Sequence, residues 1–369
     1  MSVLKLALLA SVVFLTATAH AALNRSGLVV FGDSLSDTGN NAAIVDALLG
    51  RIRTPTPIPN ALTGGTLVPT FPYATDRYSN GNLWVDTFAP AIGQRATALM
   101  DGGTNYAFGG ARVGPVNSRG LLDPGGFPPT VATQVASFLR TGAVNPNALY
   151  VMTGGNNDAR DAFGPSGIAG LIADNANAIT LGIMPSVSAV ITNAAAQFSS
   201  QVAASVAALK SAGALDIVVW NVANVATTPE SIGLATSFTS SGGAPSYAEI
   251  GVQLSDAMNS ALVSAVSSFS RVHIFDFHGV LQKAVTSGTF SNVTDACAAS
   301  LTCDPLNYLY WDGIHPTSAM HGVLSTAMVD FVTAVPEPHT YGMMLAGIAV
   351  IGAVVHLRRR LKQTQASAG

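Results

Sequence analysis

The sequence predicts an α/β protein, with a three-layer α/β/α sandwich built around a sheet of parallel strands. Short β-branched runs alternate with long Ala-rich stretches of helical character, and strands that alternate with helices favour parallel pairing. Three polar, Gly-rich motifs directly follow apolar runs. Because α/β folds bind ligands beyond the carboxyl ends of their strands, these motifs predict where a functional site should assemble.

The predicted elements follow one another in a regular order along the chain. The candidate strands are the apolar runs at residues 28–31, 104–108, 148–153, 216–222 and 272–277. The candidate helices are the longer segments at residues 131–140, 194–212 and 247–269. No internal repeat or long linker divides this part of the chain, which predicts one domain over residues 22–334.

Two segments between these elements have the composition of loops. Residues 51–72 are rich in Pro, Thr and Gly, which predicts an ordered excursion over the surface and not a domain boundary. Residues 237–245 are rich in Ser and Gly, and we expect them to be mobile.

Charge and cysteine content exclude some classes of function. The chain has 369 residues and a net charge of −3, which is too near neutrality for a nucleic-acid partner that needs a basic face. Its two cysteines are Cys297 and Cys303. Two lone thiols lack the further ligands of a metal site, so we expect no metal and predict a disulfide in an oxidising compartment.

The N-terminus has the pattern of a secretory signal peptide, predicted over residues 1–21. Lys5 provides the positive charge, residues 6–15 form a short apolar stretch, and Ala-His-Ala at residues 19–21 is a small-x-small cleavage site. The alternative is a first buried helix or strand of the domain.

The C-terminus carries a second targeting pattern, over residues 335–369. Val-Pro-Glu-Pro at 335–338 precedes an apolar run at about 341–357 and a basic cluster of three Arg and one Lys. The run is near the lower limit of a transmembrane helix, and the basic cluster should stay cytoplasmic. The pattern resembles the PEP-CTERM sorting signal of Gram-negative bacteria. This implies export across the inner membrane, transient anchoring, processing by sorting machinery, and a cell-surface or extracellular location. A plain tail anchor is the alternative.

Ser34 is the first candidate for chemistry, in the segment Phe-Gly-Asp-Ser-Leu-Ser-Asp at residues 31–37. It follows an apolar run, so its hydroxyl should lie at the end of a strand and face a cleft. Its backbone amide can also serve as one donor to an oxyanion. Taken alone, Gly-Asp-Ser is weak evidence, because a serine there also fits a helix N-cap.

Asp312 and His315 supply the partners that a serine nucleophile needs. They lie in Tyr-Trp-Asp-Gly-Ile-His-Pro-Thr at residues 310–317. One ring nitrogen of His315 can accept the Ser34 proton, while Asp312, three residues earlier, can hold the other nitrogen. Asp-x-x-His alone also fits half a metal site or a buried pair, but no His-x-x-x-His cluster accompanies it. His321, in the predicted helix that follows, has the more ordinary expectation of a structural role.

Two further segments offer donors for the negative charge of an acyl-transfer transition state. Asn-Tyr-Ala-Phe-Gly-Gly-Ala at residues 105–111 provides backbone amides that a ligand can approach closely, because glycine has no Cβ. Gly-Gly-Asn-Asn-Asp at residues 154–158 provides a side-chain amide. Each segment alone also fits a strand-terminating turn, but together they occur in order with Ser34 and His315.

These four segments resemble the GDSL, or SGNH, hydrolase family, over roughly residues 27–332. The first segment, Phe-Gly-Asp-Ser-Leu-Ser-Asp-Thr-Gly-Asn, is similar to the branch with plant-type GDSL lipases and bacterial haemolysin-like and autotransporter esterases. The resemblance implies a flavodoxin-like sheet of about five parallel strands. It also implies a triad of Ser34, Asp312 and His315.

The resemblance further implies three oxyanion donors: the amides of Ser34 and Gly110 and the side chain of Asn157. Gly109 is a rival for Gly110. Two nearby aspartates, Asp33 and Asp37, are candidates to orient the Ser34 loop, with solvated or helix-capping roles as alternatives. The segment that contains Arg77, Tyr78, Asn80 and Trp84 also resembles a family segment, and we expect it to pack around the site.

The resemblance and the residues together predict an exported serine hydrolase that cleaves carboxylic esters through an acyl-enzyme, without a cofactor. The expected substrate is a lipid, a small ester or an acylated polysaccharide. Alternatives are acyl transfer to another acceptor, a polysaccharide O-acetyl esterase with the same triad, and a non-catalytic surface protein with a retired site. Gly-x-Ser-x-Gly, P-loop and dinucleotide motifs are absent from the sequence.

Overall fold

The structure of the chain is a computed structural model. It describes residues 25–49, 76–114, 127–300, 302–334, 347–352 and 354–356. The chain divides into two compact units, of which one is Arg25–Met328 and the other joins Met1–Asn24 with Val329–Gly369. The predicted signal peptide, the Val-Pro-Glu-Pro motif and the excursion at 51–72 lie outside the described residues.

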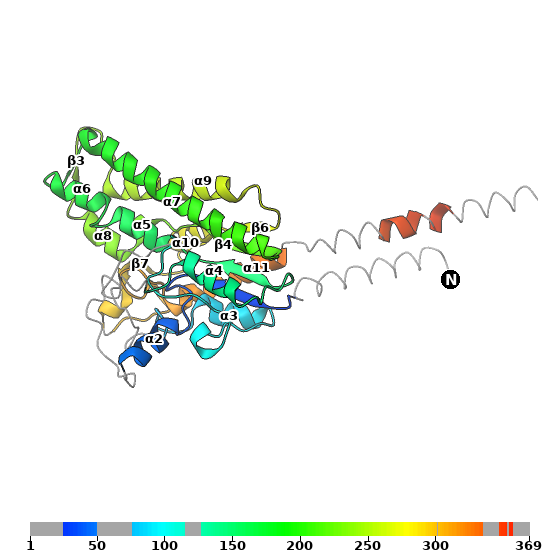
Figure 1. The fold of residues 1–369 in the computed structure, drawn as a ribbon. Coiled ribbons are helices and arrows are strands. Elements are labelled where there is room, and N and C mark those ends of the chain that lie inside the picture. The colour runs from blue at the N-terminus through cyan, green and yellow to red at the C-terminus, as the bar shows by residue number, and fades with distance from the viewer. Residues whose placement is uncertain are drawn as a thin grey trace, which may run out of the picture. The chain divides into compact units, whose positions relative to one another are not determined.

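A parallel sheet lies at the centre of the larger unit (Figure 1). Its strands are β1 (Leu28–Phe31), β2 (Leu149–Met152), β4 (Asp216–Trp220) and β6 (Val272–Phe275). They pair in parallel in the order β1-β2-β4-β6. Every residue of β1, β2 and β4 is buried, as expected for parallel strands covered on both faces. The predicted α/β class is therefore confirmed.

The fifth predicted strand, at residues 104–108, forms a single bridge to β1 and not a regular strand. The Val30 amide donates to the Thr104 carbonyl at 3.1 Å, and the Tyr106 amide donates to the Val30 carbonyl at 2.7 Å. The Phe108 amide then donates to the Gly32 carbonyl at 3.1 Å. With this segment beside β1, the spatial order becomes the flavodoxin-like 2-1-3-4-5. Its topological switch point, where such folds bind ligands, lies between β1 and β2.

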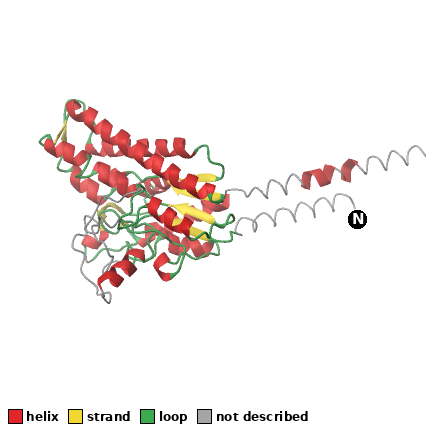
Figure 2. Cartoon of the chain, viewed as in Figure 1, coloured by secondary structure: helices red, strands yellow, loops and turns green. Residues whose placement is uncertain are grey.

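Helices cover both faces of the sheet (Figures 1 and 2). On one face, α4 (Val131–Arg140), α7 (Met184–Ser211) and α9 (Tyr247–Val266) bury the main apolar core against alternate strand residues. On the other, α3 (Trp84–Ala91) places Trp84 4.6 Å from Trp220, measured between ring centroids. The start of α11 (Ser318–Ala334) contacts α3 through His321, whose Nδ1 accepts the Trp84 amide at 3.2 Å. The three-layer prediction is thus confirmed.

The remaining helices are α2 (Asn40–Leu49), α5 (Asn156–Phe163), α6 (Ile168–Asp174), α8 (Pro229–Ala235) and α10 (Phe277–Thr286). Of the predicted helices, 131–140 has the bounds of α4, while α7 begins ten residues before the predicted 194. That first part of α7 is rich in Ser, Thr and Val, which are weak helix formers. Val187 and Ile191 are nevertheless buried in the core, so tertiary packing extends the helix.

Two small parallel sheets flank the central one. β3 (Ala178–Ile179) pairs with β5 (Thr239–Ser240), and β7 (Asn292–Ala296) pairs with β8 (Tyr308–Tyr310). The segment at 237–245, which we expected to be mobile, therefore contains an element of a sheet. The Ser240 hydroxyl also donates to the Ala244 carbonyl at 2.6 Å. Hydrogen bonding that composition does not reveal orders this segment.

The predicted transmembrane run at about 341–357 is described in part, as an apolar helix over Gly347–His356. Its described Ile and Val side chains are 46–62% exposed within the protein. Among the described residues, one helix is both long and apolar enough to cross a membrane by length and composition, at Leu181–Ser211. That helix includes α7, which packs in the core of the larger unit.

Candidate active site

Ser34 lies in the turn that follows β1, at the carboxyl edge of the sheet. Gly32 makes this turn possible, because a Cβ at this position would overlap the Thr153 hydroxyl at the end of β2. The side-chain amide of Gln134 fixes both polar groups of Gly32. Gln134 Oε1 accepts the Gly32 amide and Nε2 donates to the Gly32 carbonyl, each at 2.8 Å. Contacts of Gly32 thus hold the turn against the end of β2 and against α4, two residues before Ser34.

Ser34, His315 and Asp312 form a continuous hydrogen-bonded chain. His315 Nε2 lies 2.8 Å from Ser34 Oγ, and His315 Nδ1 lies 2.6 Å from Asp312 Oδ2. The three residues are 6%, 3% and 0% exposed, respectively. This arrangement lets the imidazole accept the serine proton while the carboxylate holds its other nitrogen.

The loop that carries His315 is irregular, and tertiary contacts hold it in place. Asp312 Oδ1 accepts the His315 amide at 2.6 Å, and the Trp311 amide donates to the His315 carbonyl at 2.7 Å. From the segment before α3, the Ser79 hydroxyl donates to the Pro316 carbonyl at 2.9 Å. These bonds fix the loop from both sides.

The segment at 77–84 packs around the site as the sequence predicts. The Tyr78 ring lies 5.3 Å from the His315 ring, and Asn80 exchanges two hydrogen bonds with Ser318, at 2.8 and 3.1 Å. Arg77 forms an ion pair with Asp86 at the start of α3. These side chains support the histidine loop and α3.

Asp37 ties the serine turn to the glycine segment at 105–111. Its two carboxyl oxygens accept three backbone amides at the start of α2, at 2.7–3.3 Å. Its Oδ2 also accepts the Gly109 amide at 2.9 Å. Burial raises the pKa of Asp37 to about 6, against the lowering effect of these amides. The Asp37 carboxylate therefore caps the start of α2 and also holds the Gly109 amide beside the serine turn.

This contact distinguishes Gly110 from its rival. The Gly109 amide is occupied by Asp37, and a Cβ at Gly109 would overlap the Tyr78 ring. Gly110 has a φ of 82°, in the left-handed region that favours glycine. Within the described part of the chain, its amide donates to no residue. Gly110 is thus the donor of the pair that remains available to a ligand.

Asn157 lies in the first turn of α5, directly after β2 and the two glycines that end it. Its Nδ2 donates to the Ala111 carbonyl at 2.9 Å, next to Gly110. An amide nitrogen carries two protons, so this bond orients the group and leaves one proton. Asn157 is 8% exposed and lines the same cavity as Ser34 and His315. The structure therefore brings together the residues predicted for the triad and the oxyanion donors, which are Ser34, Gly110, Asn157, Asp312 and His315.

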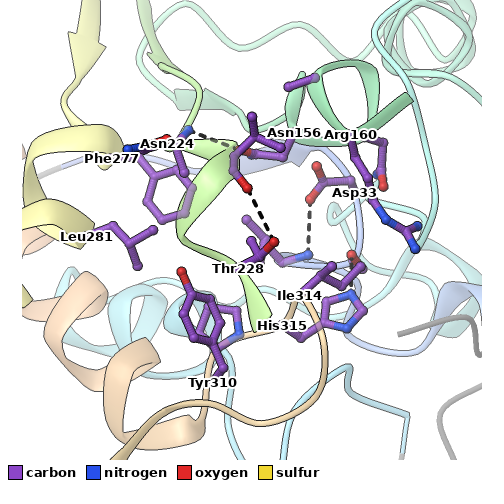
Figure 3. Close-up of a pocket in the computed structure, with 17 residues that line it drawn as sticks. Asp33, Asn156, Arg160, Asn224, Thr228, Phe277, Leu281, Tyr310, Ile314 and His315 are labelled. Atoms are coloured by element: carbon purple, nitrogen blue, oxygen red, sulfur yellow. Dashed lines mark hydrogen bonds between the residues drawn. The ribbon is translucent and has the colours of Figure 1, made fainter. Parts of the chain in front are cut away.

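A cavity extends from Ser34 and His315 along the carboxyl edge of the sheet (Figure 3). One wall is apolar, with Phe277 and Leu281 of α10 and Tyr310 of β8. The lining also contains the polar side chains of Asp33, Asn156, Arg160 and Thr228, and Asn224 lies beside Phe277. No group of three or more His, Cys, Asp or Glu in the described ranges could hold a metal ion.

Comparison with known proteins shows what this arrangement belongs to. The GDSL-like Lipase/Acylhydrolase family matches residues 28–328, most of the chain. The chain belongs to this family. In addition, the PEP-CTERM protein-sorting motif matches residues 334–360, so the GDSL domain is followed by a signal for export through a Gram-negative sorting system.

One curated relative of this GDSL-family chain is a protein of Pseudomonas putida, described as "Uncharacterized protein in trpE-trpG intergenic region". It is 26% identical over 325 residues, which are 80% of this chain and 46% of the relative. The chain thus spans about half the length of the curated relative it matches.

Several residues that build the GDSL site were not found by sequence reasoning. Asn40 Nδ2 donates to the Asn105 and Ala107 carbonyls, both at 2.8 Å, and Asn105 Nδ2 donates to the Ser36 carbonyl at 2.7 Å. These two amides join the serine turn to the glycine segment, and Gln134 holds Gly32 of the same turn. The signal available was the presence of buried Asn within the two motifs themselves.

A disulfide joins Cys297 and Cys303 near the histidine loop. Cys297 is buried against Trp311, and the Ala298 amide donates to the Trp311 carbonyl at 2.8 Å. Trp311 immediately precedes Asp312. The cystine loop therefore packs directly on the residue that leads into the histidine loop.

Proposed function

We propose that this GDSL-family protein is a serine esterase that works by two-step acyl transfer. His315 takes the proton of Ser34 as the hydroxyl attacks the ester carbonyl, and Asp312 stabilises the imidazolium that forms. The imidazolium then protonates the leaving alcohol. A water activated by the same histidine attacks the acyl-enzyme, releases the acid and restores Ser34.

The observation that carries this proposal is the chain of short hydrogen bonds. Ser34 Oγ and His315 Nε2 are 2.8 Å apart, and His315 Nδ1 and Asp312 Oδ2 are 2.6 Å apart. Both distances lie within the range that a nucleophile, its base and an orienting group require. Burial of all three residues supports the proposal, because a carboxylate stabilises a neighbouring imidazolium more strongly away from water.

Negative charge on the former carbonyl oxygen would be held by the amides of Ser34 and Gly110 and by Asn157 Nδ2. The first turn of α5 adds favourable potential, because the N-terminal end of a helix carries partial positive charge. The family's acylhydrolase description and the apolar wall of the cavity both support a carboxylic ester as substrate.

The test is hydrolysis of p-nitrophenyl acetate and butyrate by the full chain and two variants. Ser34→Ala and His315→Ala should each lower kcat by at least about a thousandfold, because the nucleophile and its base act as a unit. The exposed Ser188→Ala on α7 is a matched control and should retain full activity. Undiminished hydrolysis by Ser34→Ala or His315→Ala would overturn the proposal.

We also propose that the protein acts outside the inner membrane and is held there transiently by the apolar segment at about 341–357. The exposed Ile and Val side chains of Gly347–His356 support a membrane environment for this helix. Fractionation of cells that express the full chain or a chain that ends at Ala334 tests the proposal. Removal of residues 335–369 should abolish membrane association of the unprocessed protein, and unchanged association would contradict it.

A further inference from the structure

One carboxyl oxygen beside the nucleophile lacks a partner. Asp33 Oδ1 accepts the Leu35 amide at 3.0 Å, but Asp33 Oδ2 has no hydrogen-bond partner among the described residues. The residue is 1% exposed, and buried polar atoms are otherwise almost always bonded. A buried oxygen left in this state destabilises the fold unless something else binds it.

The roles already assigned do not account for this oxygen. Asp312 uses Oδ1 for two backbone amides and Oδ2 for His315. Asp37 uses both of its oxygens for backbone amides. The local turn explains only Oδ1 of Asp33. The second oxygen is therefore open to a group outside the chain's described hydrogen bonding.

Asp33 lies in the lining of the cavity that contains Ser34. Asp33 directly precedes Ser34 and lines the same cavity (Figure 3). It is covered to a similar degree as Ser34 and His315, at 1% against 6% and 3% exposure. Asp33 and Ser34, which are neighbours in the sequence, therefore line one cavity.

The other polar groups of the cavity lining point to the kind of ligand. Asn156 Oδ1 accepts the Ala223 amide and Asn224 Oδ1 accepts the Ala226 amide, both at 3.1 Å. Their Nδ2 groups donate to no residue that the structure describes. The cavity lining thus contains an acceptor at Asp33 and amide groups at Asn156 and Asn224. A hydroxyl suits such a lining, since it both donates and accepts.

We propose that Asp33 is a specificity-determining residue that binds a hydroxyl group of the substrate, so that the site favours esters with a free hydroxyl close to the ester bond. This inference rests on the proposed esterase function. Burial raises the pKa of Asp33 to about 6, and a hydroxyl suits either form, since it donates to a carboxylate and accepts from a carboxylic acid. Arg160 also lines the cavity, but its guanidinium is ion-paired with Glu230, and the test therefore includes a cationic ester.

Two matched ester pairs distinguish a hydroxyl on the acyl side from one on the alcohol side. The first pair is p-nitrophenyl 3-hydroxybutyrate and p-nitrophenyl butyrate, and the second is glycerol monobutyrate and propyl butyrate. For the wild-type chain, kcat/KM should favour the hydroxylated member of at least one pair by about tenfold or more, the range of a hydrogen bond to a charged group.

Asp33→Asn should lower that ratio several-fold, because a neutral amide binds a hydroxyl less strongly than a carboxylate does. General damage to the site lowers kcat/KM for both members of a pair and cancels in the ratio, so a merely structural role would not change it. Asp304→Asn is a matched control, because Asp304 Oδ1 also accepts the amide two residues later, at 3.1 Å, but Asp304 does not line the cavity. This control should keep the wild-type ratio.

Three outcomes would overturn the inference. The first is that the wild-type chain prefers neither hydroxylated ester, a result that does not depend on whether Asp33→Asn folds. Alternatively, Asp33→Asn keeps the preference, or Asp33 instead selects butyrylcholine over its neutral 3,3-dimethylbutyl analogue. The proposed function fails separately, when Ser34→Ala retains hydrolysis of any of these esters.

Discussion

The two halves of the candidate site are built in different ways. On the serine side, Ser34 and Asp37 follow a buried strand of the main sheet, and side-chain bonds to nearby backbone fix the turn. On the histidine side, Asp312 and His315 follow a three-residue strand of a two-stranded sheet. Their loop depends on contacts from Ser79 and from the cystine region. The comparison shows that packing in the core positions the nucleophile, whereas contacts outside the main sheet position its base.

The largest expected effect concerns the histidine side. Asp312→Asn should lower kcat by about ten-thousandfold, because the amide favours the wrong tautomer of the catalytic imidazole. Steady-state kinetics on p-nitrophenyl butyrate measure this effect. Asp330→Asn, on the far part of α11, serves as the matched control. A loss of less than tenfold would mean that Asp312 does not orient His315.

On the serine side, Asn157→Ala should lower kcat by about a hundredfold with little change in KM. The lost donor acts on charge that develops only in the transition state. The exposed Asn175→Ala, at the end of α6, should leave kcat unchanged. If KM rises and kcat stays constant, Asn157 binds the ground state and is not an oxyanion donor.

The cystine loop provides a smaller test that separates the two sides. The double change Cys297→Ser and Cys303→Ser should reduce the free energy of unfolding by about 2 kcal/mol, as expected for a short closed loop. Because this loop packs on Trp311, kcat should also fall several-fold. Denaturant unfolding and kinetics measure both quantities. Full activity in the double variant would show that the histidine loop does not depend on the disulfide.

Asp33 predicts a pH dependence of stability with an unusual sign. The pKa of Asp33 is raised from 3.8 to about 6 by burial, so the folded state binds its proton more tightly than the unfolded chain. Asp33 therefore costs stability progressively as pH rises from about 4 to 6, and the cost persists above 6. The difference in free energy of unfolding between Asp33→Asn and wild type should therefore increase by about 2–3 kcal/mol, in favour of the variant, from pH 4 to pH 7.

Urea unfolding of both proteins at each pH gives this difference. His321 has the opposite effect: burial lowers its pKa from 6.5 to about 3, so its contribution is lost as pH falls from 6.5. His321 is common to both proteins and cancels in the comparison. A difference between wild type and Asp33→Asn that does not depend on pH would contradict the raised pKa.

The sequence predicted the fold well where burial is continuous. Residues 28–31 and 131–140 coincide with β1 and α4, since apolar runs and an N-cap at Thr130 define them locally. The first ten residues of α7 and the pairing of β5 with β3 were not predicted, because tertiary packing and not local propensity determines them. The segment at 104–108 lies along β1 but is too irregular to be a strand.

The sequence predicted those residues of the candidate site that lie within recognisable motifs. Ser34, Gly110, Asn157, Asp312 and His315 could be named from their motifs, although their catalytic roles stay predictions. Gln134 and the apolar wall at Phe277 and Tyr310 could not be named, because they come to the cavity from distant parts of the chain. The orphan oxygen of Asp33 also depends on which amides its neighbours occupy, which no motif records.

The most direct test of the central claim is labelling with a fluorophosphonate probe, followed by peptide mass spectrometry. One probe molecule per chain should attach to the peptide that contains Ser34. Labelling should disappear in Ser34→Ala and slow by at least about a thousandfold in His315→Ala. A label on another serine, or no label on a chain that still hydrolyses esters, would contradict the account.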